Sequence, residues 1–129
     1  MENIMSDKIQ FTGRYECLGN SYIAPILIEG ITFPSVTHAL RSAQISDRSL
    51  KVAISKAATI QAIDKLLVDV FIRPNWEQVK HATLHQLVKL KFESHKDLAD
   101  ILLSTENKPL GKVLTKVRSE LLRERPKIS

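Results

Sequence analysis

Downstream of Ser35, apolar residues recur every three or four positions, and this spacing predicts a body of amphipathic helices. Proline, asparagine and serine residues divide the pattern into short segments. We expect helices to begin near Ser35, Leu50, Thr59, Trp76, Ser94 and Pro109. Ser35 and Asn75 are expected to cap the helices that follow them, and Ser94 with Asp97 has the form of a capping box.

The segment from residue 8 to residue 33 has a different pattern, rich in β-branched residues and interrupted by glycine and proline. This composition predicts short strands. Glu29-Gly30 is placed to form a hairpin turn between residues 26–28 and 31–33. The expected fold is therefore α+β, mainly α: a short N-terminal β element packed on a helical body. We expect one domain over residues 1–129, with 1–7 and 124–129 as loose termini.

The composition excludes several classes of protein. With 43% hydrophobic and 26% charged residues the chain is not intrinsically disordered, and no apolar run approaches the roughly 18 residues of a membrane span. The N-terminus lacks the pattern of a secretory signal, which favours the cytoplasm. Cys17 has no second cysteine to pair with, and His81 and His85 lack a third ligand, so we expect no disulfide, metal or cofactor.

The net charge of +5 is concentrated near the C-terminus, where Lys108, Lys112 and Lys116 repeat every four residues along the last expected helix. Such a basic stripe can bind the phosphates of a nucleotide or of a nucleic acid. It can equally keep the helix soluble and complement its dipole. The sequence leaves both interpretations open.

Several short motifs occur in a fixed order along the chain. They are LGNSYIAP at residues 18–25, FPSVTHA at 33–39, RPNW at 73–76, KF at 91–92, LLST at 102–105 and LGKVLTKVR at 110–118. Each motif alone is weakly specific. The ordered set resembles the YbiA/NADAR family of N-glycosidase-fold proteins over roughly residues 9 to 122. The small size of the chain is also similar to that expected of a phage-encoded branch of the family. A phage-encoded protein would act in the host cytoplasm.

The resemblance implies a chemistry and a set of site residues. Members of the family are N-glycosidases that cleave the bond between ribose and a nitrogen base, in a riboflavin-pathway intermediate or in ADP-ribose joined to a nucleobase. Because the sugar becomes positively charged in such a reaction, a carboxylate is needed to stabilise it or to position water. By resemblance, Asn20, Thr37, His38 and Trp76 occupy ligand-binding positions of the family.

Departures from the family pattern bear on this chemistry. Thr37 stands where the family has its catalytic glutamate. Gln44 replaces a lysine, and Leu67-Val68 replaces a Gly-Arg pair. The stretch that carries the family's catalytic aspartate is reduced to residues 106–109, which leaves Glu106 as a candidate substitute acid. Since a positioned acid or base contributes about 10²- to 10⁴-fold to the rate, loss of both acids argues against inherited catalysis.

Three hypotheses follow. The leading one is a YbiA-like domain with a degenerate active site that is not catalytic and binds a nucleotide or ADP-ribose-like ligand, or a protein partner. The second is a divergent N-glycosidase that uses Glu106. The third is a small basic accessory protein that contacts nucleic acid through its last helix. The residues named for ligand binding can also have purely structural roles. Trp76 can pack in the core, His38 can be a structural histidine and Asn20 can form a turn. None of the three predicts an oligomeric state or a membrane contact.

Overall fold

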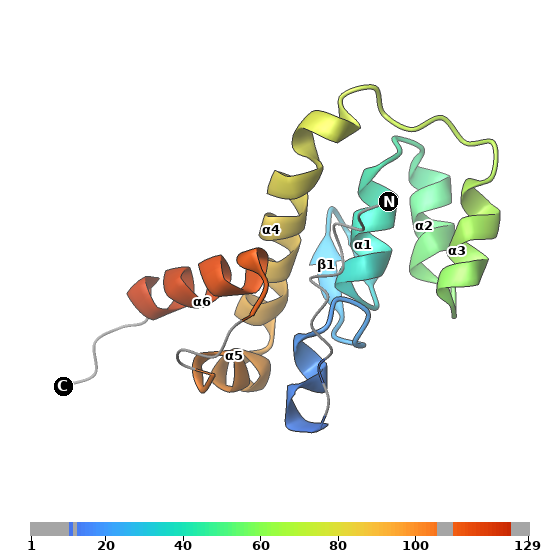
Figure 1. Ribbon diagram of the computed structural model, residues 1–129. Helices are drawn as coiled ribbons and strands as arrows, with labels where there is room; N and C mark the ends of the chain where they lie inside the picture. The colour runs from blue at the N-terminus through green and yellow to red at the C-terminus, as the bar shows by residue number, and fades with distance from the viewer. Residues whose placement is uncertain (1–10, 12, 106–109, 125–129) are drawn as a thin grey trace.

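The computed structural model describes residue 11 and residues 13–105 and 110–124 of the chain, which form a helical body around a small hairpin (Figure 1). In chain order the elements are a 3-10 helix η1 (Gly13–Leu18), strands β1 (Ile26–Ile28) and β2 (Ile31–Phe33), and helices α1 (Val36–Ala43), α2 (Arg48–Ser55), α3 (Ile60–Leu67), α4 (Trp76–Ser94), α5 (Lys96–Leu103) and α6 (Lys112–Glu124). The expected α+β, mainly α fold class is confirmed.

The hairpin forms where the sequence predicts it. β1 and β2 pair antiparallel, with Ile26 opposite Phe33. Glu29 has φ 51° and Gly30 has φ 82°, and a two-residue turn with both φ angles positive matches the right-handed twist of the flanking strands. Ile26 and Phe33 are buried, whereas Leu27 on the opposite face is exposed. One face of the hairpin therefore packs on the helices.

The long helix α4 lies at the centre of the helical body (Figure 1). It contacts α1 and β1 on one side, and α5 and α6 on the other. The main core joins buried residues of all these elements, and its largest α4 members are Leu84, Leu87, Val88 and Phe92. A smaller core of Ile45, Ile54 and Ile63 holds α2 and α3 beside α1. No helix in the described part of the chain has the length and hydrophobicity to cross a membrane.

Two helix starts differ from the sequence-based expectation. The side chain of Asp47 accepts the N–H of Leu50, so α2 begins at Arg48 and not near residue 50. The capping box at Ser94 and Asp97 is wrong, because α4 continues through Ser94 and the chain turns at His95. At α2 the cause is local, because the capping side chain nearest the chain reversal determines where the helix starts. His95, at the N-cap position of α5, makes no side-chain capping bond.

The N-caps of α1 and α4 differ from each other. Ser35 accepts the N–H of His38, as expected for a cap of α1. Asn75 stands at the N-cap position of α4, but its side chain makes no capping hydrogen bond. The expected capping is therefore confirmed at Ser35 and wrong in its chemistry at Asn75.

Other expectations fail because tertiary contacts override local pattern. The chain from Gly13 to Leu18 is a 3-10 helix and not a strand; it buries Cys17 and Leu18 and contacts α5. The helical spacing of apolar residues after Asn75 predicts an inner stripe for this helix, which is only partly right: Trp76, Val79, Thr83, Leu87 and Leu90. The buried α4 residues are Trp76, Leu84, Leu87, Val88, Lys91 and Phe92. Because α1 covers one side of α4 while α5 and α6 cover another, the buried surface is wider than one stripe.

The C-terminal end of the helical body also differs from the expectation. Residue 124 was expected to begin a loose terminus, but Glu124 is the last residue of α6 and accepts a hydrogen bond from Lys89 at 2.7 Å. Residues 1–10 and 125–129 lie outside the described part of the chain, as do Glu106 and Lys108.

Candidate functional site

Thr37, which the sequence resemblance aligns with the family's catalytic glutamate, lies in the first turn of α1 and is 2% exposed. Its hydroxyl lies 2.9 Å from the hydroxyl of Ser21, and its backbone N–H donates to the carbonyl of Asn20 at 3.0 Å. These two bonds join α1 to the segment between η1 and β1. Thr37 is therefore a structural tie between two parts of the chain.

The Thr37–Ser21 bond can be tested directly. We expect Thr37→Val and Ser21→Ala each to lower the free energy of unfolding by about 1 kcal/mol, because each removes one partner of a partly buried hydrogen bond. Urea unfolding of the single and double variants measures the coupling. The double variant should lose little more than either single variant, whereas fully additive losses would contradict a bond between the two hydroxyls.

His38 is buried, and both of its ring nitrogens have partners. Nδ1 lies 2.7 Å from the Ser35 hydroxyl, and Nε2 lies 2.9 Å from the carbonyl oxygen of Ala57. A carbonyl can only accept, so Nε2 carries a proton, and in the neutral ring Nδ1 accepts from Ser35. His38 thus joins α1 to the segment that follows α2, which leaves neither nitrogen available for a substrate.

Trp76 and Asn20 complete the set of four residues implied by the resemblance. Trp76 begins α4, is 7% exposed and belongs to the main core. Asn20 is half-buried, and its carbonyl accepts the N–H of Thr37. The structure thus brings Asn20 and Thr37 together, whereas the ring of His38 is bonded to Ser35 and Ala57, and Trp76 packs in the core.

Lys91 is a buried cation whose role the sequence does not predict. Its side chain is 1% exposed, donates to the carbonyl of Gly19 at 2.8 Å, and lies 5.9 Å from the centre of the Tyr22 ring. Burial lowers the pKa of Lys91 to about 8, because the interior disfavours the charged form. Burial likewise raises the pKa of Cys17, a neighbour with which Lys91 interacts electrostatically. Lys91 fixes the segment that contacts Thr37, and the KF motif is the sequence signal that marks it.

A second pair of motif residues has the same kind of role. Arg118, from the last motif, donates to the hydroxyl of Thr105, from the LLST motif, at 2.6 Å, and both residues are buried. The motifs that carry the family resemblance are thus linked to one another by Thr37–Asn20, Lys91–Gly19 and Arg118–Thr105 contacts. These contacts stabilise the fold, and they would do so with or without catalytic activity.

The remaining sequence candidates lie apart from α1. Lys112 and Lys116 are exposed on α6 and border a shallow groove with Thr115, Ser119 and Arg123. His85 is paired with α6: its Nε2 lies 2.6 Å from the Glu120 carboxylate, and this hydrogen bond lowers the pKa of Glu120. Within the described residues, no group of three His, Cys, Asp or Glu side chains could hold a metal ion.

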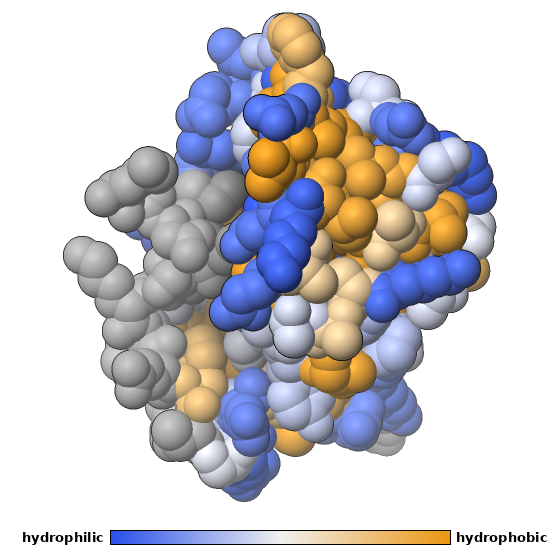
Figure 2. Space-filling view, turned by 90° about the vertical axis from the view of Figure 1, so that its right-hand side faces the viewer, coloured by the Kyte–Doolittle hydropathy of each residue, from blue (hydrophilic) through white to orange (hydrophobic). Residues whose placement is uncertain are grey.

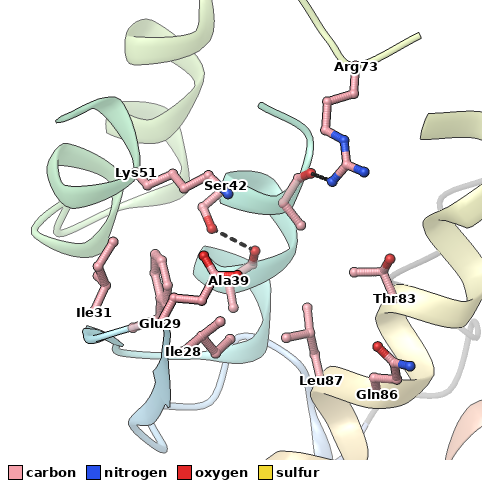
Figure 3. Close-up of a pocket in the computed structure, with 12 residues that line it drawn as sticks. Ile28, Glu29, Ile31, Ala39, Ser42, Lys51, Arg73, Thr83, Gln86 and Leu87 are labelled. Atoms are coloured by element: carbon pink, nitrogen blue, oxygen red, sulfur yellow. Dashed lines mark hydrogen bonds between the residues drawn. The ribbon is translucent and has the colours of Figure 1, made fainter. Parts of the chain in front are cut away.

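A cleft of about 280 Å³ lies between the hairpin, α1, α2 and α4 (Figure 3). Its polar lining consists of Glu29, Ser42, Lys51, Arg73, Thr83 and Gln86. Its apolar lining consists of Ile28, Ile31, Phe33, Ala39, Ala43 and Leu87. The sequence pattern does not predict this site because its residues come from separate elements. Phe33 and Ala39 belong to the FPSVTHA motif and Arg73 to the RPNW motif, but the other lining residues belong to no motif.

An apolar surface covers the end of α3 and the chain that follows it. Figure 2 shows apolar side chains gathered on the side of the molecule where α3 lies in Figure 1. Val68 is 65% exposed and Phe71 is 88% exposed, and Leu67 beside them is partly buried. Leu67 and Val68 are the residues that replace the family's Gly-Arg pair, so this surface lacks a cation that the family pattern contains.

Comparison with known proteins points to one group of relatives. The N-glycosidase YbiA of Escherichia coli K12 is 25% identical over 111 residues, which cover 81% of this chain and 69% of that protein. The N-glycosidase YbiA of Shigella flexneri is 24% identical over the same length and the same shares. No protein-family model matches the chain.

The fold gives an independent comparison. The NMR structure of the E. coli protein YbiA matches with a TM-score of 0.70 and 22% identity, covering 95% of each chain. A phage origin is not tested by these matches and stays a prediction. Sequence similarity, fold and the ordered motifs agree, and the chain is therefore YbiA-like in sequence and in fold.

Proposed function

We propose that this chain is a YbiA-like domain without N-glycosidase activity that binds a nucleotide or an ADP-ribose-like ligand. The observation that carries the proposal is Thr37, a buried threonine bonded to Ser21 at the position of the family's catalytic glutamate. A hydroxyl carries no charge near neutral pH, so it cannot stabilise a positively charged sugar as a carboxylate does. The lost acid removes the main contribution that this position makes in the family.

The surroundings of Thr37 and His38 support the same conclusion. Their described side-chain partners are the hydroxyls of Ser21 and Ser35 and the carbonyl of Ala57, and none of these is an acid. His38 uses both ring nitrogens in these bonds, so it cannot protonate a departing base without breaking a link that holds α1 in place. The first turn of α1 therefore serves the fold.

Ligand binding is the activity that remains for such a domain. The relatives are named N-glycosidases. The sequence resemblance implies substrates that contain ribose, a base and, in one class, phosphates. Loss of the acids removes the bond-breaking step but does not by itself remove the ability of the fold to bind a ligand. Among the sequence hypotheses, we therefore propose the nucleotide version of the leading one.

Isothermal titration calorimetry with ADP-ribose and AMP tests the ligand. We expect saturable binding with a dissociation constant below a millimolar, and ligand recovered unchanged from the sample by chromatography. A flat titration with both compounds at millimolar concentration would remove the proposal. E. coli YbiA titrated under the same conditions serves as the reference for the family.

The groove on α6 favours a second candidate, contact with nucleic acid. Lys112, Lys116 and Arg123 lie on one exposed side of this helix, and clustered cations bind phosphates. If the third hypothesis holds, single-stranded DNA binds, its affinity falls steeply with salt, and Lys112→Gln with Lys116→Gln lowers both affinity and salt slope. Binding that is absent, or unchanged in this double variant, excludes the candidate. The thermal midpoint should stay within about 2 °C, because both side chains are exposed.

The protein-partner form of the leading hypothesis rests on the apolar surface around Phe71. Contiguous exposed apolar surface is typical of protein contacts. If the chain self-associates through this surface, Phe71→Ser shifts it to a monomer in analytical ultracentrifugation at unchanged stability. If the wild-type chain sediments as a monomer at all concentrations, it does not self-associate through this surface.

A further inference from the structure

We infer that the cleft between the hairpin, α1, α2 and α4 is the ligand site, and that Lys51 and Arg73 bind a phosphate group there. This inference rests on the proposed function and adds where the ligand binds and which of its groups is recognised. The ligand would bind not at the first turn of α1, where the sequence resemblance places it, but in the cleft. Ala39, Ser42 and Ala43 of the same helix line this cleft.

The first turn of α1 is closed. Thr37 is 2% exposed and His38 is 5% exposed, and their polar atoms are bonded to other parts of the chain. A ligand could reach them only by displacing those bonds. The cleft needs no such rearrangement, because its volume of about 280 Å³ is present in the structure.

Lys51 is the uncommitted cation of the cleft. In Figure 3 its side chain extends from α2 toward Ser42. Within the described residues Lys51 has no hydrogen-bond or ion-pair partner, in contrast to Lys80 and Lys89, which are paired with Glu77 and Glu124. An unpaired ammonium group at the wall of a cleft is placed to bind an anion.

Arg73 contributes a second cation that is fixed in position. One terminal nitrogen donates to the carbonyl of Ala43 at 3.2 Å, and its backbone N–H donates to the carbonyl of Gln44 at 2.8 Å. Figure 3 shows the guanidinium group between α1 and α4. The bond to Ala43 offsets the partial negative charge at the C-terminal end of α1, which would otherwise repel an anion. A guanidinium group has five N–H donors, so donors remain for a ligand.

The rest of the lining indicates the class of ligand. Ile28 and Ala43, which are only partly buried, offer an apolar surface for a base or another flat group, and Thr83 and Gln86 on α4 offer polar groups opposite α1. Ligand pockets commonly have volumes of about 300–1,000 Å³. The cleft, at about 280 Å³, is just below this range, so the largest ligand it fits is a mononucleotide or the terminal part of a larger nucleotide.

Lys51→Gln tests the site, with Lys56→Gln as a matched control. Lys56 is an exposed lysine at the end of α2 that does not line the cleft. We expect calorimetry to show AMP affinity lowered about tenfold by Lys51→Gln and unchanged by Lys56→Gln, because only the former removes a charge-assisted contact. Wild-type chain should bind adenosine, which lacks the phosphate, at least tenfold more weakly than AMP.

The outcomes separate the site from the proposed function. Equal AMP affinity in Lys51→Gln, Lys56→Gln and wild type overturns the site while leaving ligand binding intact. Equal affinity for adenosine and AMP overturns recognition of the phosphate. Absence of AMP and ADP-ribose binding in the wild type overturns both the site and the proposed function. Thermal unfolding of Lys51→Gln should match wild type, since Lys51 has no described partner to lose.

Discussion

Replacing Lys91 with methionine is expected to remove a rise in stability that the wild-type chain shows between pH 8 and pH 10.5. The pKa of Lys91 is about 8 in the folded chain, against an ordinary value of 10.5. Below pH 8 both the folded and the unfolded chain carry the proton. Between the two pKa values the folded chain releases it while the unfolded chain keeps it, so the free energy of unfolding rises with pH. The full rise is about 3 kcal/mol.

The measurement is urea unfolding from pH 7 to pH 10, with the difference between variant and wild type as the readout. The difference is used because Cys17 also makes stability depend on pH. The pKa of Cys17 is raised, so its contribution to the free energy of unfolding falls as pH rises, opposite to that of Lys91. Lys91→Met should be at least as stable as wild type near pH 7, since it removes a buried charge and keeps the apolar stem. Lys96→Met, at an exposed lysine of α5, should leave the pH dependence unchanged. Parallel curves for wild type and Lys91→Met would contradict a depressed pKa.

Replacing His38 with alanine is expected to lower the free energy of unfolding by about 3 kcal/mol. The substitution leaves a cavity and removes the bonds to Ser35 and Ala57, which join α1 to the end of α2. The measurement is urea unfolding at pH 7. His81→Ala, at an exposed position of α4, is the matched control and should change the free energy by less than about 0.5 kcal/mol.

A ligand-binding histidine would behave differently. In that case His38→Ala would unfold like His81→Ala but would lose its affinity for ADP-ribose. A loss of stability with retained affinity at a temperature where the variant is folded supports the structural role. The two properties are measured on the same samples, so they separate the two roles of His38.

Local chemistry explains which parts of the fold the sequence predicts. The Glu29-Gly30 turn and the Ser35 cap depend on residues a few positions apart, so the pattern predicts them. The 3-10 helix at Gly13–Leu18 and the wide buried face of α4 depend on α5 and α6, which the local pattern does not contain. The capping box at Ser94 failed because Ser94 is the last residue of α4, and α5 begins only at Lys96.

In the candidate site, too, some features depend on local sequence and others on contacts between distant residues. The motifs indicate the first turn of α1, and the comparisons confirm the resemblance to YbiA. The roles of Thr37 and His38, however, depend on partners at Ser21 and Ala57. The cleft depends on four elements at once, and its Lys51 belongs to none of the family motifs. Sequence therefore identifies the family and the departures from it, while the structure is needed to see which polar groups are already committed.

Release of free base is the measurement that tests the central claim most directly. The chain is incubated with a ribosylamino-pyrimidine and with an ADP-ribosylated nucleobase, with E. coli YbiA as the positive control, and the products are separated by chromatography. With Thr37 bonded to Ser21 in place of a carboxylate, we predict no release above the level without protein. Release at a rate comparable to the control, abolished by Glu106→Gln, would contradict the account and establish a divergent N-glycosidase.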